Sequence, residues 1–201
     1  MTAYYKVVRA DLQSYHGGAG KWTVGKWRTV KGPLEACRNG LHFVTLAQLP
    51  EWLGPTICPF EPAEGTEIVD GGNKWACRKG RIGGPLATWN ARTQRLFAAD
   101  CAEHVLPIFE KRYPADTRPR EAIAVARRFA NGEATREELG AEFLAANAAA
   151  AANAAYDTAA YAAKYAANAA NAANAAANAA ANERKWQSQR LATYLEIEVS
   201  Q

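Results

Sequence analysis

Residues 166–182 read AANAANAANAAANAAAN, and this stretch decides how the chain is divided. Alanine is the best helix former and asparagine is one of the poorer ones, so the stretch is predicted to be helical on average. Its asparagines recur every three or four residues, which at 100° per residue places them in a stripe about 120° wide. The rest of the helix surface is alanine, which buries little apolar area per residue. The stretch therefore predicts a helical region stabilised by helix propensity and by close packing of small side chains.

The Ala/Asn-rich tract extends over residues 141–182 and contains one candidate break. At Tyr156-Asp157-Thr158, the Asp or Thr side chain could cap a new helix. We expect two long helices that fold back on each other, with a single long rod as the alternative. Bulky side chains return after the tract at Trp186, Leu191 and Leu195, and these are expected to hold the hairpin against earlier helices.

Helical patterns also precede the tract. Residues 96–113 carry apolar side chains at helical spacing, with a proline inside that would kink or split the helix. The sequence Asp116-Thr117-Arg118-Pro119 predicts a helix start, and Asn131-Gly132 predicts its end. Thr135 followed by Glu138 is a capping box that opens another helix.

The first 87 residues show strand and turn signals instead. Aromatic and β-branched runs separated by Gly and Pro predict strands at 3–12, 21–30, 41–46 and 66–70, with 74–82 as the hairpin partner of the last. Residues 47–53 predict a brief helix or turn. The expected fold class is α+β: a small β-rich α+β domain over residues 1–87, followed by an all-α, Ala/Asn-rich helical bundle or hairpin over residues 88–201.

Four cysteines, Cys37, Cys58, Cys77 and Cys101, occur without a C-x-x-C pair. The opening residues MTAYYKVVRADL contain no apolar signal core, so we expect a cytoplasmic location and reduced thiols. His42 and three of these cysteines could form a zinc site, but structural zinc sites contain at least one close ligand pair. Buried thiols and a core histidine are the favoured interpretation, and no metal is expected. Asparagine and charged residues interrupt the tract, which argues against a membrane span.

The formal net charge of +4 is uneven, with +6 up to residue 95 and −2 after it. Residues 74–81 (KWACRKGR) place four cations around an aromatic side chain, a composition that suits an acidic protein face or a nucleic acid. The alternative is a sheet edge that charge protects from unwanted pairing. The candidate partner-binding residues are Trp75, Arg78, Lys79 and Arg81, together with Asn171, Asn174 and Asn178 of the tract.

Two resemblances cover most of the chain. Cys37–Phe43 (CRNGLHF), with Gly72 and Lys74 later, resembles an uncharacterised phage and prophage domain with a C-x-x-G-[FL]-H-F core. That resemblance spans about the first 85 residues and carries no assigned chemistry. The motifs CAEHVL (101–106), DTRPREAI (116–123) and ERKWQ (183–187) resemble a helical family of immunity proteins of polymorphic toxin systems, over roughly residues 96–195. The second resemblance implies a protein that occludes a partner.

We therefore expect a non-enzymatic, phage-associated binding protein that inhibits a bacterial partner, either by toxin immunity or by counter-defence such as anti-CRISPR activity. The partner would be a host or phage protein, including a nucleic-acid-containing defence complex. No catalytic residue and no cofactor are expected. An alternative is an ADP-ribosyltransferase-like enzyme that uses His16 of the glycine-rich turn, and a third is a structural or scaffolding phage component. The oligomeric state stays open.

Overall fold

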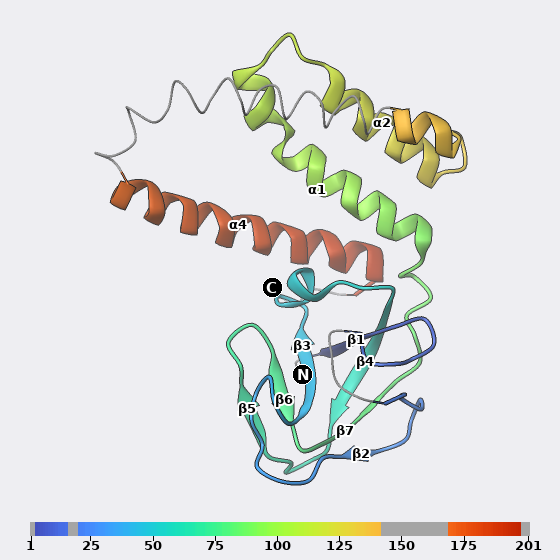
Figure 1. The fold of residues 1–201 in the computed structure, drawn as a ribbon, viewed down its shortest axis with the longest axis vertical. Coiled ribbons are helices and arrows are strands. Elements are labelled where there is room, and N and C mark those ends of the chain that lie inside the picture. The colour runs from blue at the N-terminus through green and yellow to red at the C-terminus, as the bar shows by residue number, and fades with distance from the viewer. Residues whose placement is uncertain (1–2, 16–19, 142–168, 198–201) are drawn as a thin grey trace. The chain divides into compact units, whose positions relative to one another are not determined.

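A computed structural model describes residues 3–15, 20–141 and 169–197 (Figure 1). The candidate break at residues 156–158 and His16 lie outside these ranges. By contacts between residues, the chain forms two compact units: Met1–Asn90 with Arg184–Gln201, and Ala91–Glu183. The first unit contains an antiparallel sheet and the second is helical, so the predicted α+β class is confirmed. The predicted domain boundary after residue 87 stays a prediction.

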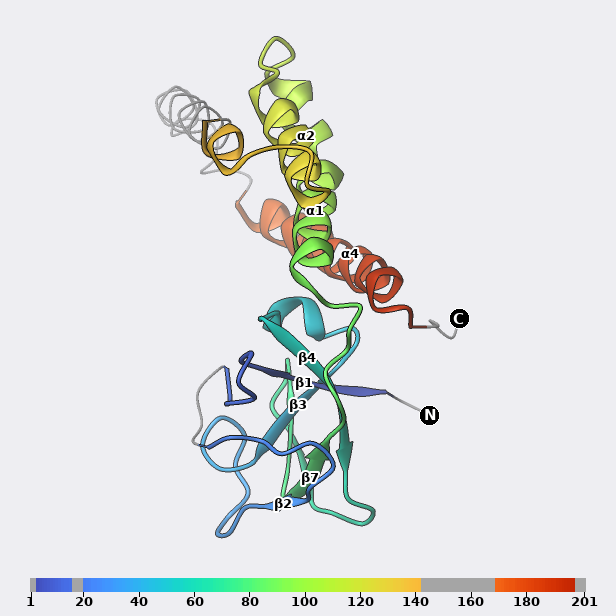
Figure 2. The ribbon, with the colours of Figure 1, turned by 90° about the vertical axis from the view of Figure 1, so that its right-hand side faces the viewer.

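The sheet has seven strands in the order β2-β7-β4-β1-β3-β6-β5, and it curls on itself (Figure 2). Every neighbouring pair is antiparallel. The strands are β1 (Tyr4–Val8), β2 (Arg28–Thr29), β3 (Leu41–Thr45), β4 (Thr56–Pro62), β5 (Ile68–Asp70), β6 (Trp75–Cys77) and β7 (Lys79–Ile82), and the 3-10 helix η1 spans Leu49–Trp52.

Alternate residues such as Tyr5, Val7 and Ile57 are buried on one face of the curled sheet, and a hydrophobic cluster lies on the other face. Because side chains alternate between the two faces of a strand, each central strand supplies every second residue to this cluster. The Phe43 and Phe60 rings stack at its centre, with their centroids 4.8 Å apart. A Cβ at Gly80 would lie 2.4 Å from Phe60 Cζ, so this strand position accepts only glycine without movement of the ring. The buried cluster comprises Val8, Trp22, Leu41, Phe43, Cys58, Phe60, Cys77 and Ile82.

Several strand predictions are confirmed. Strand β3 lies within the predicted 41–46, and η1 lies within the predicted 47–53. Strands β5 and β6 pair as an antiparallel hairpin in which Asp70 lies opposite Trp75. Between them Gly72 has a φ of +83°, a conformation that glycine adopts without steric cost.

Two strand predictions are wrong in part, and one strand was missed. The predicted strand 21–30 shrinks to the two residues of β2, because the chain turns at Gly25, whose φ is +74° and whose N–H donates to the Ile82 carbonyl. The predicted strand 74–82 breaks at Arg78, so that β6 pairs with β3 and β5 while β7 pairs with β2 and β4. Strand β4 was not predicted at all.

The helical unit contains α1 (Ala91–Arg112) and α2 (Arg118–Ala130). Helix α1 is five residues longer at its start than predicted, and it continues through Pro107 instead of splitting there. The predicted start and end of α2 are confirmed, and Gly132 takes a φ of +79° directly after Asn131.

The predicted capping box is also confirmed. The Thr135 N–H donates to Glu138 Oε2 over 2.7 Å, and the Glu138 N–H donates to Thr135 Oγ1 over 3.1 Å. Two backbone donors at the start of the helix are thereby satisfied reciprocally.

Helix α4 (Ala169–Leu195) confirms that the end of the Ala/Asn tract is helical. Its last residues, from Arg184 onward, group by contact with the sheet unit and not with the earlier helices. Leu191 and Leu195 are buried there, and the Leu195 carbonyl accepts a hydrogen bond from the Thr88 hydroxyl. No helix in the described ranges combines the length and the apolar character that crossing a membrane requires.

Candidate functional site

The predicted cationic contact residues lie on β6, on β7 and at the break between them. Trp75 on β6 is half-buried and packs against the core cluster. Arg78, at the break, forms an ion pair with Glu67 and donates to the Gly32 carbonyl over 2.7 Å. Arg78 is thus engaged in holding three segments of the sheet unit together.

Arg81 and Lys79 differ in how their charges are balanced. Arg81 lies opposite Glu61 on β4, and its Nη2 is 2.7 Å from Glu61 Oε2. Lys79 is exposed, and no carboxylate of the described residues lies within 4 Å of its ammonium. Of the predicted cations, Lys79 is therefore the one with an unneutralised charge at the surface.

Both β7 cations approach an aromatic ring that is not among the predicted contact residues. Trp27, directly before β2, is 41% exposed, and its ring centroid lies 4.5 Å from Arg81 Cζ and 5.5 Å from Lys79 Nζ. Cations at these distances are attracted to the face of an indole ring. We call Trp27, Lys79 and Arg81 the β7-edge patch. The alternation of polar and small residues in KGRI could have indicated that Lys79 and Arg81 share one face.

The predicted asparagines occupy backbone positions in α4. Asn171, Asn174 and Asn178 fall within its range, but their side chains lie outside what the structure describes. They stay predicted contact residues.

The helical unit presents a second exposed surface on α1. Val105 is 42% exposed and Ile108 is 76% exposed, and a spacing of three residues places them side by side on a helix. Two adjacent exposed aliphatic side chains offer a small apolar area that a partner could cover. We call this pair the α1 apolar face.

A buried ion pair joins α1 to α2 elsewhere in the same unit. Asp100 on α1 is only 5% exposed, and its Oδ1 lies 2.6 Å from Arg127 Nη1 on α2. The same guanidinium also pairs with Glu103. This cluster fixes the two helices to each other, so the α1 apolar face belongs to a defined helix pair.

The cysteines are free thiols, and the predicted burial is found for Cys58 and Cys77 but is wrong for Cys37, which is exposed; Cys101 is half-buried. Burial raises the pKa of Cys58 to about 11 and that of Cys77 to about 12, which keeps both protonated at neutral pH. His42 Nε2 accepts a hydrogen bond from the Cys37 backbone N–H over 2.9 Å. Among residues 3–15, 20–141 and 169–197, no three His, Cys, Asp or Glu side chains gather closely enough to hold a metal ion.

Comparison with known protein families shows a match in the helical part of the chain. The family model described as "Imm-5 like putative immunity protein" matches residues 85–180, which include α1, α2 and the first part of α4. No curated protein and no solved structure matches the chain. Residues 85–180 are therefore similar to Imm-5 like immunity proteins, while residues 1–84 lie outside that match.

Proposed function

We propose that this chain is a non-enzymatic binding protein that neutralises a bacterial toxin by covering the surface the toxin needs for its action. The family match over residues 85–180 is the observation that carries this proposal, because immunity proteins bind a cognate toxin. The matched segment includes the α1 apolar face, which provides an exposed surface that a toxin could contact.

The α1 apolar face is the contact surface we favour. Burying a fully exposed Ile side chain stabilises an association by about 1.5–3 kcal/mol, and Ile108 is the most exposed large apolar residue of those described. A partner that covers Ile108 and Val105 would gain from apolar burial at the centre of the contact, which is where binding energy concentrates. Asn171, Asn174 and Asn178 also lie in the matched segment and are proposed as polar contacts.

The β7-edge patch is the alternative contact surface. Its unneutralised Lys79 beside the exposed Trp27 suits an acidic partner surface, because a cation and an aromatic side chain together provide charge and contact area. Arg78 and Trp75 were predicted beside it, and we expect them to contribute indirectly through the shape of the sheet edge.

The test is a rescue assay in bacteria. The tagged full chain is used to isolate a stoichiometric partner from host lysate, and the partner is then expressed alone and together with the chain. We expect the partner alone to arrest growth and co-expression to restore it. Ile108→Glu should abolish the rescue, and Lys79→Glu should leave it intact, so each variant is the matched control of the other. Both residues are exposed, so neither change should disturb folding.

Other outcomes identify other functions. Loss of rescue with Lys79→Glu and not with Ile108→Glu would move the contact to the β7-edge patch. A partner that belongs to a nucleic-acid-containing defence complex and causes no growth arrest would support phage-borne counter-defence. Self-assembly of the chain without any partner would support a scaffolding role. Transfer of labelled ADP-ribose from NAD, abolished by His16→Ala, would support the enzyme alternative and overturn the proposal.

A further inference from the structure

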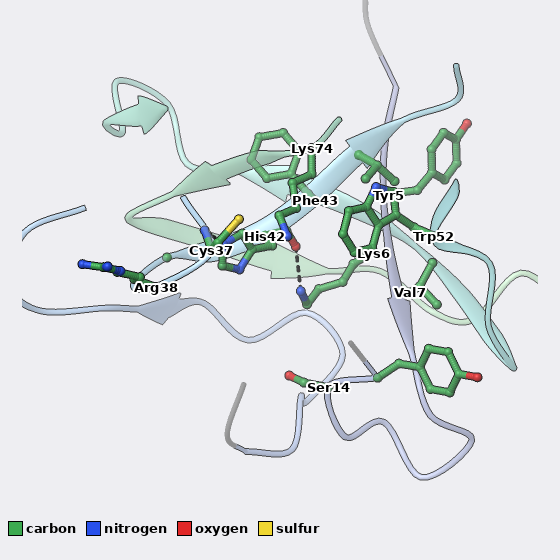
Figure 3. A pocket seen from close by; sticks show the side chains of 13 residues that line it. Tyr5, Lys6, Val7, Ser14, Cys37, Arg38, His42, Phe43, Trp52 and Lys74 are labelled. Carbon is green, nitrogen blue, oxygen red and sulfur yellow. Dashed lines mark hydrogen bonds between the residues drawn. The ribbon is translucent and has the colours of Figure 1, made fainter. Parts of the chain in front are cut away.

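A cavity of about 230 Å³ lies in the sheet unit, where β1 and β3 separate (Figure 3). The two strands pair only at Tyr4 with Thr45 and at Tyr5 with Val44, and the cavity opens beyond the second pair. Five residues of the Cys37–Phe43 segment line it. Its volume is just below the range of typical ligand pockets, so it suits a small molecule.

Lys6 is the unusual residue of this cavity. Strand alternation places it on the same face of β1 as Tyr4 and Val8, which both belong to the core or pack against it. Its Nζ donates to the His42 carbonyl over 2.6 Å (Figure 3). The same Nζ lies 5.0 Å from the Trp22 ring centroid. Within the described part of the chain, no carboxylate lies within 4 Å of it. A buried ammonium ordinarily has such a counter-charge.

The surroundings of Lys6 add further positive charge. Lys74, on another wall of the cavity, holds its Nζ 4.3 Å from the Trp52 ring centroid. Arg28 Cζ lies 4.5 Å from the Trp22 ring that Lys6 also faces. Burial lowers the pKa of Lys6 to about 8, and the charges of Arg28 and Lys74 contribute to the same shift.

The polar groups around the two lysines are not acidic. No Asp or Glu is among the described residues that line the cavity. His42 is neutral, because burial and the charges of Lys6 and Lys74 lower its pKa to about 4. Arg38 at the rim is 78% exposed and lies 3.4 Å from Glu35, so its charge is already partly balanced.

We propose that this cavity binds a small anionic molecule whose carboxylate or phosphate oxygens lie between Lys6 and Lys74. Ammonium groups bind both kinds of oxygen through charge-assisted hydrogen bonds, and Lys6 has N–H donors left after its bond to the His42 carbonyl. The apolar part of the ligand would lie against Trp52, which lines the same cavity. This proposal is independent of toxin binding, since every residue it uses lies outside the family match.

The test measures binding of two probes, inorganic phosphate and benzoate, to the full chain by calorimetry at constant ionic strength. We expect at least one probe to bind in the millimolar range or tighter. Lys6→Met should weaken binding about tenfold or more, because a charged hydrogen-bond donor is lost. Lys26→Met, at an exposed lysine outside the cavity, should leave binding unchanged. Binding of phosphate alone or benzoate alone would identify the headgroup.

A second readout uses NMR titration of the lysine side chains. In the free protein one lysine should titrate near pH 8, and its pKa should rise when the anion binds, because a bound negative charge favours the ammonium form. If Lys6→Met does not fold, Lys74→Met serves the same purpose from the other wall. Binding that both variants leave unchanged, or no binding of either probe above that of chloride, overturns the proposal.

Discussion

Replacing Arg127 with methionine tests the buried ion pair that holds α1 to α2. The Asp100 carboxylate is almost fully buried, and Arg127 Nη1 lies 2.6 Å from its Oδ1. Removing one partner of a buried pair typically costs about 3–5 kcal/mol, because the other charge stays buried without its counter-charge. Asp100 keeps other interactions, so we expect Arg127→Met to lower the free energy of unfolding by about 3 kcal/mol, at the lower end of that range.

Arg128 provides a matched control on the same helix. Its guanidinium lies 3.4 Å from Glu138, and both side chains are about half exposed, with relative areas of 48% and 47%. An exposed pair of this kind contributes about 0–1 kcal/mol, so Arg128→Met should change stability little. The measurement is urea denaturation of the intact chain followed by circular dichroism at a helix-sensitive wavelength.

The double variant Asp100→Asn with Arg127→Met decides between a specific pair and general damage to the helix. If the pair is the cause, removing the carboxylate should recover part of the loss, and the two changes should be clearly non-additive. Equal effects of Arg127→Met and Arg128→Met, or simple additivity in the double variant, would refute the reasoning.

Three further outcomes are expected. The Cys58 and Cys77 thiols keep their protons in the folded state but lose them above about pH 9 in the unfolded state. The free energy of unfolding should therefore fall as the pH rises past 9, by about 1.4 kcal/mol per thiol at pH 10. Urea midpoints measured across this range test this, and a flat profile would contradict it. Gly80→Ala should destabilise the sheet unit by about 1–3 kcal/mol, because the added methyl group would collide with the Phe60 ring. Gly84→Ala should change stability little in the same assay, because its added carbon meets no other side chain or distant backbone atom within 4 Å. Thr135→Ala removes the side-chain cap of the helix that starts after Thr135 and should lower the local stability of that helix by about 1 kcal/mol. Amide hydrogen exchange at the start of the helix measures this loss.

Local sequence signals were sufficient to predict helix ends and tight turns. The Thr135 capping box, the Asn131-Gly132 stop and the turn at Gly72 were predicted because each depends on a few neighbouring residues. Strand β4 was missed because prolines at positions 59 and 62 argue against a central strand. Pro59 is accommodated at the point where pairing with β7 ends, and its carbonyl still accepts a hydrogen bond from the Gly83 N–H.

The candidate sites depend on pairings between distant residues, which local patterns do not reveal. The KWACRKGR segment correctly indicated a concentration of charge, but the ion pairs of Arg78 with Glu67 and of Arg81 with Glu61 follow from strand register. The sequence around Lys6 does contain a local signal for its placement. A lysine between Tyr4 and Val8 in an alternating strand occupies a position that normally faces the core.

The positive charges of the first half of the chain differ in whether a carboxylate balances them. Arg78 and Arg81 are neutralised by carboxylates of neighbouring segments, so reversing their charges would weaken the sheet unit as well as any contact made there. Lys6 and Lys74 have no such partners among the described residues and can be neutralised without breaking an ion pair. Because they also lie outside the matched segment, Lys6→Met should weaken anion binding while leaving the growth rescue intact, and Ile108→Glu should abolish the rescue while leaving anion binding intact. If either variant lost both anion binding and growth rescue, the two proposed sites would be coupled. The contacts described for the two sites share no residue and give no reason to expect such coupling.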